Sequence, residues 1–425
     1  MIQTIAIVWL WYVWLPLAYS FAKAWYRVIW FDISDRRLQE LQAWKDSTNE
    51  IWDAISQVSI LYTKNPQDLV VADMIIVTVP TPVNDNKDPD YTPLILASTM
   101  IGGILRSNHI VVYESTVDPW ATEEVCLPIL EKASGLSCPE DFTIWYSPER
   151  INPGDKEHTV EKIVKVVSWI NAESLHIIAE TYRSIIHAWV HEATSIKVAE
   201  ASKIIENTQR DINIWFINEL SKICDKLWIN TFDVLEAAGT KWNFLRFTPW
   251  LVWGHCIWVD PYYLAKKAQK LWINPELILA WRRTNDEMGL YVANQIIKML
   301  IKADKKIEWS TVLIMWLTFK ENVPDFRNSK IGDVIKELKD FGIHIVWVDP
   351  YSDHLHDHIL HELSLSKDEI IPSLIAWATY DGIVYAQDHK EFASLHLESL
   401  CKKDWIIFDI KGKFRKEWFT HYKSL

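Results

Sequence analysis

The sequence predicts an α/β protein in which two doubly wound parallel sheets are joined by a central helical segment. Short apolar, β-rich runs alternate with helical patterns at both ends of the chain, which is the pattern of parallel sheets covered by helices. Between them, residues 193–227 contain neither glycine nor proline, which favours one long helix. We therefore predict three domains, at residues 1–190, 191–303 and 304–425.

The N-terminal domain is expected to hold five buried strands. The strands are Thr4–Val8, Arg27–Phe31, Met74–Val79, Ile110–Tyr113 and Phe142–Tyr146. Ligands of open α/β sheets bind outside the carboxyl ends of the strands. The residues that directly follow these strands are therefore the first candidates for a functional site.

The C-terminal domain repeats this pattern. A strand at Thr311–Met315, a helix from about Ser329 to Phe341 and a strand at His344–Val348 predict a second Rossmann-like unit. Helical character between the two domains continues to about Leu300 and is interrupted by the loop Gly239–Pro261. We expect these central helices to act as a spacer and as an oligomer interface.

Tryptophan stands at three spaced positions where the first strand runs into a helix. Trp9, Trp11 and Trp14 occupy the places of the glycines in the G-x-G-x-x-G fingerprint of dinucleotide-binding βαβ units. Those glycines allow a tight turn, close approach of the main chain to a pyrophosphate, and close helix–strand packing. The segment therefore indicates a dinucleotide site, but an indole at any of the three positions would fill space that the site needs.

Composition indicates that this replacement is systematic. The chain has 25 Trp and 11 Gly in 425 residues, whereas average glycine usage is roughly 7%. Trp228 and Trp272 follow expected helix ends, and Trp120 follows a proline turn, which are contexts that favour glycine. We hypothesise that most of these residues are glycines encoded by UGA and misread as tryptophan. A naturally tryptophan-rich protein is the alternative, and UGG codons at positions 9, 11 and 14 would establish it.

Charge and cysteine content exclude several functions. The net charge is −12 without a basic tract, so nucleic acid or an anionic membrane is not an expected partner. The five cysteines are scattered and lack metal spacing, which is typical of a reducing cytoplasm. The apolar stretch Ile5–Ala22 lacks a basic n-region and contains Pro16, so it does not resemble a signal peptide. The histidines of Asp353–His361 are irregularly spaced, and we predict no metal site.

Candidate cofactor residues follow the second, third and fourth strands. Asp32 ends the second strand, where an acid can accept hydrogen bonds from an adenosine ribose, which favours NAD over NADP. Arg37 lies one turn further and could cover the adenine. Thr81 and Thr116 follow the next two strands and could line the cleft. A loop-capping aspartate and turn-capping hydroxyls are the alternatives.

Candidate catalytic residues lie after the fifth strand and on the long helix. Glu149 and Arg150 put an acid and a base at the edge of the sheet, although either could be a surface charge. Lys203 and Asn207 are four residues apart and share a helical face, so together they could hold a developing oxyanion. The alternative is a solvated face that includes Glu200 and Glu206.

The loop Pro249–Pro261 surrounds a single cysteine with suspected glycines. With glycine restored it contains V-G-G-H-C-I-G-V-D-P, so Cys256 lies in a flexible loop and Asp260 follows four residues later. A thiol in such a loop is a candidate nucleophile, and a nearby cation such as Lys203 would favour its thiolate.

With glycine restored, these motifs together resemble the nucleotide-sugar 6-dehydrogenases, the family of the UDP-glucose and UDP-mannosaminuronate dehydrogenases, over essentially the whole chain. They are the fingerprint, Val79–Pro82, Glu114–Val117, Ser147–Gly154, Ser195–Leu220 and Thr240–Leu264. Thr240–Leu245 and His255–Ile257 are similar to the UDP-N-acetylhexosamine branch of Vi-antigen and O-antigen synthesis. That branch also has tryptophan at position 242, so we take Trp242 as a true tryptophan.

The resemblance implies a role for each candidate. A cysteine would form a thiohemiacetal and then a thioester, a lysine and an asparagine would hold the oxyanion, an aspartate would assist proton transfer, and a glutamate and a threonine would order the hydrolytic water. The cysteine is Cys256, and the oxyanion would be held by Lys203 and Asn207. The aspartate is Asp260, and the water would be ordered by Glu149 and Thr116. The expected cofactor-binding residues are Trp9, Trp11, Tyr12, Val13, Trp14, Asp32, Arg37, Thr81, Thr116 and Arg327. The expected substrate-binding residues are Glu149, Arg150, Lys203, Asn207, Arg246, Trp253, Gly254 and Lys320.

The resemblance thus implies a cytoplasmic, homodimeric or larger, NAD-dependent oxidoreductase. It would oxidise the C6 hydroxyl of a UDP-N-acetylhexosamine, GlcNAc or GalNAc, to the uronate for surface polysaccharide, in a four-electron reaction. UDP-glucose or UDP-N-acetylmannosamine is the alternative substrate, and a non-catalytic nucleotide-sugar binding protein is the alternative of another class. Sequence does not choose between the epimers of the hexosamine.

Overall fold

The protein is described here by a computed structural model of the chain. It describes residues 2–9, 14–46, 50–84, 86–152, 155, 157–168, 170, 172–254, 256–318, 321–323, 325–371, 379–390, 396–417 and 419–425. The chain folds as two compact units: Met1–Asn207 with Val259–Asn274, and Thr208–Trp258 with Pro275–Leu425. Each unit is described separately, and the three predicted domain boundaries stay a prediction.

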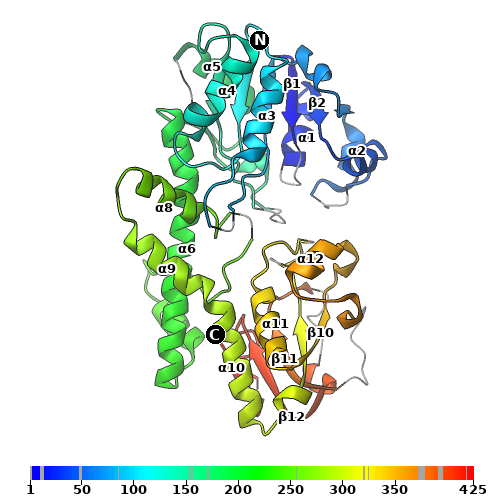
Figure 1. Cartoon of the computed structure of the whole chain (residues 1–425), viewed down its shortest axis with the longest axis vertical. Coiled ribbons are helices and arrows are strands. Elements are labelled where there is room, and N and C mark those ends of the chain that lie inside the picture. Colours follow the sequence, from blue (N-terminus) through cyan, green and yellow to red (C-terminus); the bar gives the residue numbers. More distant parts are fainter. Residues whose placement is uncertain are drawn as a thin grey trace. The chain divides into compact units, whose positions relative to one another are not determined.

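The first unit is built on a six-stranded parallel sheet with the order β3-β2-β1-β4-β5-β6 (Figure 1). Its strands are β1 (Thr4–Val8), β2 (Arg27–Phe31), β3 (Ile60–Thr63), β4 (Met74–Val77), β5 (Ile110–Tyr113) and β6 (Thr143–Tyr146). The five predicted strands are confirmed. The additional strand, β3, lies at the sheet edge and is only partly buried, which explains why it lacks a clear apolar run.

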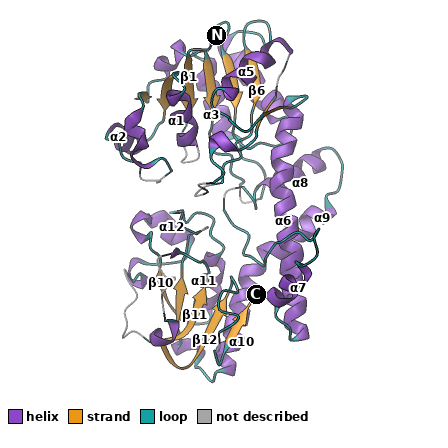
Figure 2. Ribbon diagram, turned by 180° about the vertical axis from the view of Figure 1, so that it is seen from behind, coloured by secondary structure: helices purple, strands orange, loops and turns teal. Residues whose placement is uncertain are grey.

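Helices cover both faces of this sheet (Figure 2). Ala6 and Val8 of β1 pack on the side of α3 (Thr92–Gly102) and α4 (Leu127–Ser134). The intervening β1 residues face the opposite side, where α1 and α5 pack. This two-sided burial is why the strands are apolar without alternation. The remaining helices of the unit are α1 (Leu15–Lys23), α2 (Asp35–Gln42), α5 (Ala172–Arg183) and α8 (Asp260–Lys270), and β7 (Lys165–Val167) pairs with β8 (Val190–Glu192).

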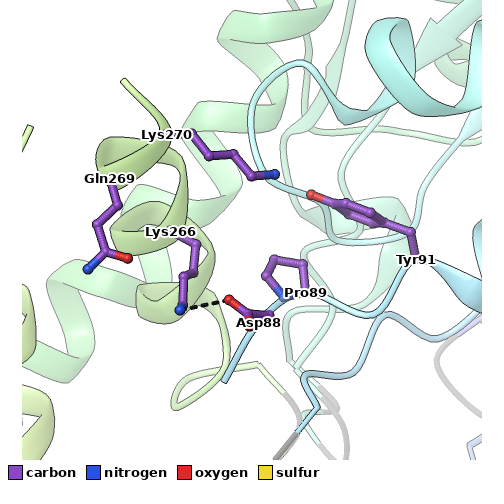
Figure 3. Close-up of a pocket in the computed structure, with 6 residues that line it drawn as sticks. All are labelled: Asp88, Pro89, Tyr91, Lys266, Gln269 and Lys270. Atoms are coloured by element: carbon purple, nitrogen blue, oxygen red, sulfur yellow. Dashed lines mark ion pairs between the residues drawn. The ribbon is translucent and has the colours of Figure 1, made fainter. Parts of the chain in front are cut away.

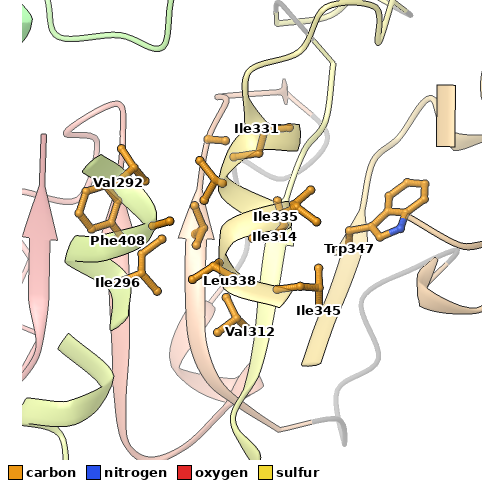
Figure 4. Close-up of a cluster of buried hydrophobic side chains, with 14 of the residues drawn as sticks. Val292, Ile296, Val312, Ile314, Ile331, Ile335, Leu338, Ile345, Trp347 and Phe408 are labelled. Carbon is orange, nitrogen blue, oxygen red and sulfur yellow. The ribbon is translucent and has the colours of Figure 1, made fainter. Parts of the chain in front are cut away.

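The second unit contains a five-stranded parallel sheet with the order β10-β9-β11-β12-β13. Its strands are β9 (Thr311–Met315), β10 (His344–Val348), β11 (Tyr380–Tyr385), β12 (Cys401–Asp409) and β13 (Tyr422–Ser424). One face packs against α10 (Met288–Lys302), α11 (Ile331–Asp340) and α12 (Asp357–Glu362). Figure 4 shows this core, in which Ile335 and Leu338 of α11 lie over Ile314 of β9.

The predicted helical middle of the chain is confirmed. A single helix of 32 residues, α6 (Ile196–Leu227), is followed by α7 (Thr231–Ala238) and later by α9 (Glu276–Asp286). In the described part of the chain, no helix combines the length and the apolar character that crossing a membrane requires.

Tryptophan repeatedly occupies a backbone conformation that side chains disfavour. Fourteen described residues other than glycine have φ between 53° and 81°, and half of them are tryptophan. They are Trp9, Trp25, Trp44, Trp120, Trp228, Trp272 and Trp316. A bulky residue in this left-handed region is a genuine outlier, whereas glycine adopts it freely.

We predict that glycine at the most exposed of these positions stabilises the protein. Trp25 and Trp272 are 95% and 98% exposed, so Trp25→Gly and Trp272→Gly remove little packing. Relief of a left-handed conformation costing about 1–2 kcal/mol exceeds the entropic penalty of glycine, about 0.4–1 kcal/mol. Each variant should therefore raise the free energy of unfolding in urea.

Trp242→Gly is the matched control for this prediction. Trp242 is 91% exposed and is not among the residues with positive φ, so glycine there should leave stability unchanged or lower it. A common effect of all three substitutions would contradict the conformational explanation.

Candidate active site

The structure brings two predicted catalytic residues together in the first unit. The Asn207 side chain, on α6, donates from Nδ2 to Oδ2 of Asp260, the first residue of α8, at 2.6 Å. Both side chains are buried, with 5% and 1% exposure. Lys203 lies one turn before Asn207 on the same helix and is half-buried. The structure thus joins Asn207 to Asp260 by a buried hydrogen bond, and the catalytic roles of both residues stay a prediction.

The alternative of a solvated helical face is wrong at Glu200, whose side chain is fully buried. Its two carboxylate oxygens accept from the main-chain N–H groups of Trp120 (2.6 Å) and Thr122 (2.9 Å). Burial raises the pKa of Glu200 to about 7, against the opposing effect of these hydrogen bonds. Glu200 therefore joins α6 to the segment that follows β5.

The predicted threonines meet at the carboxyl edge of the sheet. Thr81 Oγ1 donates to the main-chain oxygen of Thr116 at 2.5 Å. The hydroxyl of Tyr263 donates to the main-chain oxygen of Thr81, also at 2.5 Å. Because Tyr263 lies one turn after Asp260 on α8, this helix connects the threonine edge with the Asn207–Asp260 pair. Sequence analysis missed Tyr263, although its spacing from Asp260 was a usable signal.

Glu149 is held by a buried charge cluster that sequence analysis also missed. Glu149 Oε1 accepts from the N–H groups of Arg150 (2.6 Å) and Ile151 (2.7 Å), and Oε2 accepts from Lys165 Nζ at 3.2 Å. Lys165 also pairs with Glu114 at 3.0 Å. Burial raises the pKa of Glu114, whereas the two carboxylates outweigh burial and raise the pKa of Lys165. The only sequence signal was a lysine within an apolar run.

Arg150 is directed toward α6. Its guanidinium bonds both carboxylate oxygens of Glu206, at 2.9 and 3.2 Å, and donates to the main-chain oxygen of Val164 at 3.0 Å. This two-point ion pair fixes the loop after β6 against α6. A substrate-binding role for Arg150 stays a prediction.

Two predicted cofactor residues flank the end of β2. Asp32 is 5% exposed, and its Oδ1 accepts from the N–H of Ser34 at 2.7 Å. Arg37, on α2, pairs with Asp46 at 3.2 Å and with Glu40 at 3.5 Å. Asp32 therefore lies at the expected strand end, and Arg37 is already engaged by two acids.

Cys256 lies in the second unit, half-buried, two residues after Gly254, which has φ 101°. Leu251, Val252 and Trp253, a few residues before it, are buried. Trp253 was predicted to contact substrate, and this stays a prediction. The indole is 1% exposed and packs in the apolar core with Met288 and Val292. A large apolar ring gains more from this core than from a solvated loop.

The remaining predicted residues are placed as follows. Arg246 is exposed, and its Nη2 donates to the main-chain oxygen of Gly239 at 3.0 Å. Arg327 forms a two-point ion pair with Asp325. Trp11, Tyr12, Val13 and Lys320 lie outside the described residues.

A pocket of about 410 Å³ lies in the first unit, apart from these residues (Figure 3). It is lined by Asp88, Pro89, Tyr91, Lys266, Gln269 and Lys270. Lys266 and Asp88 form an ion pair across it at 2.7 Å. None of its lining residues was predicted to be functional.

Three models of one family match the chain. Residues 3–186 match the NAD binding domain of the UDP-glucose/GDP-mannose dehydrogenase family, residues 197–287 its central domain, and residues 313–416 its UDP binding domain. Protein CapL of Staphylococcus aureus is 48% identical over 413 residues, covering 96% of both chains. A UDP-N-acetyl-D-glucosamine 6-dehydrogenase of Pseudomonas aeruginosa is 48% identical over 415 residues, also with 96% of both chains. The solved UDP-D-ManNAc dehydrogenase of Pyrococcus horikoshii is similar with a TM-score of 0.88 and 26% identity, covering 99% and 98% of the two chains.

At the end of β1 the main chain of Trp9 has a conformation that glycine adopts freely, whereas its side chain is one that disfavours it. Trp9 has φ 68°, as glycine in a tight turn would, and its N–H donates to the oxygen of Phe31 at 2.9 Å. Its indole lies against the apolar core. The indole N–H of Trp14, at the start of α1, is buried and finds no partner among the described residues. Asp32 and the main chain of this turn would hold NAD.

We predict that Glu200 makes stability fall as pH rises toward neutrality. Its pKa of about 7 lies above the ordinary value of 4.5, so ionisation costs more in the folded than in the unfolded state. The resulting stability is complete below pH 4.5 and is lost as pH rises through 7, about 3 kcal/mol in all. Glu200→Gln should flatten this decline in thermal midpoints between pH 5 and pH 8.

Glu219→Gln, on an exposed face of the same helix, is the control and should keep the wild-type pH dependence. An unaltered decline in the Glu200→Gln protein would show that another group causes it.

Proposed function

The chain belongs to the UDP-glucose/GDP-mannose dehydrogenase family, and we propose that it oxidises the C6 hydroxyl of a UDP-N-acetylhexosamine to the carboxylate for surface polysaccharide. Its cofactor is NAD, in keeping with the family's NAD binding domain. The observation that carries the substrate class is the 48% identity, over 96% of both chains, to a protein named UDP-N-acetyl-D-glucosamine 6-dehydrogenase. UDP-GlcNAc is therefore the first substrate to test.

The proposed chemistry uses the thiol of Cys256 to retain the aldehyde. When bound, NAD supplies the hydride acceptor, and two equivalents are needed for each alcohol oxidised to a carboxylate. The first oxidation removes a hydride from C6 and a proton from its hydroxyl. The Cys256 thiolate then adds to the aldehyde carbon and forms a C–S bond. Loss of the second hydride gives a thioester, and water breaks the C–S bond to release the carboxylate and the thiol.

Asn207, Lys203 and Asp260 would stabilise charge during these steps. Since Asp260 accepts one amide proton of Asn207 at 2.6 Å, it fixes the orientation of the carboxamide. An oriented amide and an ammonium on one helical face form a suitable site for the oxyanion of the thiohemiacetal. Asp260 is also the acid nearest in sequence to Cys256 and would exchange protons with the reacting oxygen.

Glu149 would hold the hydrolytic water. Its carboxylate accepts from two main-chain N–H groups and from Lys165, and these donors fix its orientation. Thr116 lies on the same unit at the end of β5 and would act with Glu149. Their arrangement supports, on chemical grounds, an enzyme rather than a binding protein without catalysis.

The function is tested by stoichiometry. We expect two NADH for each UDP-GlcNAc consumed, with UDP-GalNAc, UDP-glucose and UDP-N-acetylmannosamine assayed in parallel. No free aldehyde should be trapped by a carbonyl reagent, because the thiol adduct retains it. One NADH per sugar, or no turnover of any of the four, would refute the proposal.

Cys256→Ser tests the covalent step. A serine hydroxyl is a poorer nucleophile at neutral pH, and its ester hydrolyses less readily than a thioester. We expect steady-state turnover to fall on the order of 10³-fold, with UDP-sugar binding retained. Cys401→Ser, at another half-buried cysteine, is the control and should turn over normally. Near-normal activity of the Cys256→Ser protein would remove this residue from the mechanism.

We further propose a homodimer or larger assembly through α6. Five of its apolar side chains are 47–61% exposed and recur at intervals of about one to three helical turns, on one face. They are Val198, Ile205, Phe216, Ile223 and Leu227. Such a stripe on a soluble protein marks an interaction surface. Sedimentation velocity should show an oligomer for the wild type and a smaller species for Phe216→Asp, and a monomeric wild type would contradict this.

We also propose a cytoplasmic location. None of the five cysteines, all within the described residues, forms a disulfide, which suits a reducing compartment.

A further inference from the structure

The loop that carries Cys256 is anchored at residue 250 by a side chain of α6. Asn218 Nδ2 donates to the main-chain oxygen of Trp250 at 2.8 Å, and Asn218 Oδ1 accepts from the main-chain N–H of the same residue at 2.9 Å. The carboxamide thus binds both polar groups of one residue, as a neighbouring strand would. Leu251 and Val252, which follow, are fully buried, so the anchored segment leads directly toward Cys256.

A buried network holds Asn218 in turn. Its Nδ2 also donates to Oδ1 of Asn285 on α9, at 2.9 Å. Asn285 Nδ2 donates to Oδ1 of Asp211 at 2.8 Å, and Asp211 is paired with Arg282 at 2.6 Å. Asp211, Asn218, Arg282 and Asn285 are each at most 1% exposed. The network therefore connects two helices of the second unit to the main chain of one loop residue.

Burying such a network costs desolvation free energy, which a simple connection between two helices does not require. A buried ion pair rarely stabilises more than apolar residues of similar volume, whereas connected hydrogen bonds specify one geometry. We propose that Asn218 is a positioning residue for Cys256, and that it acts by fixing the main chain of residue 250 so that the cysteine loop keeps one conformation. This inference rests on the proposed role of Cys256 as the nucleophile.

The alternative is that the network only ties α6 to α9. A tie of that kind would lower global stability when broken but would not alter the reactivity of one particular thiol. The rate at which iodoacetamide alkylates Cys256, followed by mass spectrometry of its peptide, separates the two. Burial raises the pKa of Cys138 to about 11 and of Cys401 to about 12, so these half-buried thiols react slowly at pH 7.

The experiment compares Asn218→Ala with Asn213→Ala in the full chain. Asn213 lies on the same helix, and its Nδ2 donates only within the helix in the described contacts, to the Gln209 oxygen at 2.7 Å. Loss of the two bonds to residue 250 should make alkylation of Cys256 about tenfold faster. It should also lower kcat about 10- to 100-fold, because the thiol is misplaced, with KM for NAD unchanged. Asn213→Ala should alter neither rate.

A folded Asn218→Ala protein whose Cys256 is alkylated at the wild-type rate would overturn the proposal, whatever its kcat. If this variant does not fold, Asn285→Ala takes its place, since it keeps both bonds to residue 250 and removes only their support. Asn285→Ala should accelerate the alkylation of Cys256 by a smaller factor. A wild-type rate of alkylation in this variant would then refute the proposal. If alkylation is faster but the Cys256→Ser protein is active, Asn218 does position the loop, and it is the proposed catalytic role of Cys256 that is rejected.

A second inference rests on the positive φ angles of seven tryptophans. Of the seven other non-glycine residues with positive φ, five are asparagine or aspartate, the types that tolerate this region. Tryptophan is not such a type, yet it accounts for the other half of the positive-φ residues. Within the described residues, the buried indole N–H groups of Trp14, Trp30 and Trp347 also find no hydrogen-bond partner. The backbone therefore disfavours tryptophan at the seven positive-φ positions, and a buried indole N–H without a partner disfavours it at three others.

We infer that the native polypeptide carries glycine at the positive-φ tryptophan positions, because its cell reads their UGA codons as glycine. Two adjacent tryptic peptides of the protein isolated from its own cells test this. Residues 227–241 contain Trp228, which has φ 59°, and residues 242–246 begin with Trp242, which is not among the residues with positive φ.

Mass spectrometry should find glycine at position 228 and tryptophan at position 242, with UGA and UGG as the respective codons. Tryptophan in the native peptide at position 228, or a UGG codon there, would overturn the inference.

Discussion

Two asparagines of one helix form the hydrogen bonds on which the chain near Cys256 in sequence depends. Asn218 of α6 holds the main chain of residue 250, and Asn207 of the same helix holds the carboxylate of Asp260. Each bond lies within one of the two units and fixes a point of the chain within six residues of Cys256 in sequence. A long helix is a stiff support, and a loop fixed at two points loses less conformational entropy when a reaction requires one geometry.

Buried charge is concentrated where a loop must be held. Lys165 lies between Glu114 and Glu149, and Arg282 pairs with Asp211. Each pair would be costly if it only added stability, because desolvation of both ions offsets their attraction. In each case one acid of the pair is also linked to the main chain. Glu149 accepts hydrogen bonds from the turn that follows it, and Asp211 is linked to residue 250 through Asn285 and Asn218. The charges thus contribute orientation more than stability.

The sequence was sufficient for the sheets and for the choice of most site residues. Strands such as β1 and β5 are apolar on both faces, and this pattern depends only on local residues. The edge strand β3 was missed because a half-exposed strand has no such pattern. Lys165 and Asn218 were missed because their partners are distant in sequence. At Trp253 the sequence suggested a glycine near the nucleophile, whereas the indole packs in the apolar core.

At two tryptophans the backbone conformation is set by the fold and not by the side chain. At Trp9 and Trp316 the chain turns with φ 68° and 81° at the ends of β1 and β9, the corresponding positions of the two sheets. The turn is imposed by the parallel strands and the helices that cover them, since the chain must leave each strand sharply to reach its helix. The fold therefore favours a residue without a Cβ at these two places, and the same turns are where a sheet of this kind receives a nucleotide.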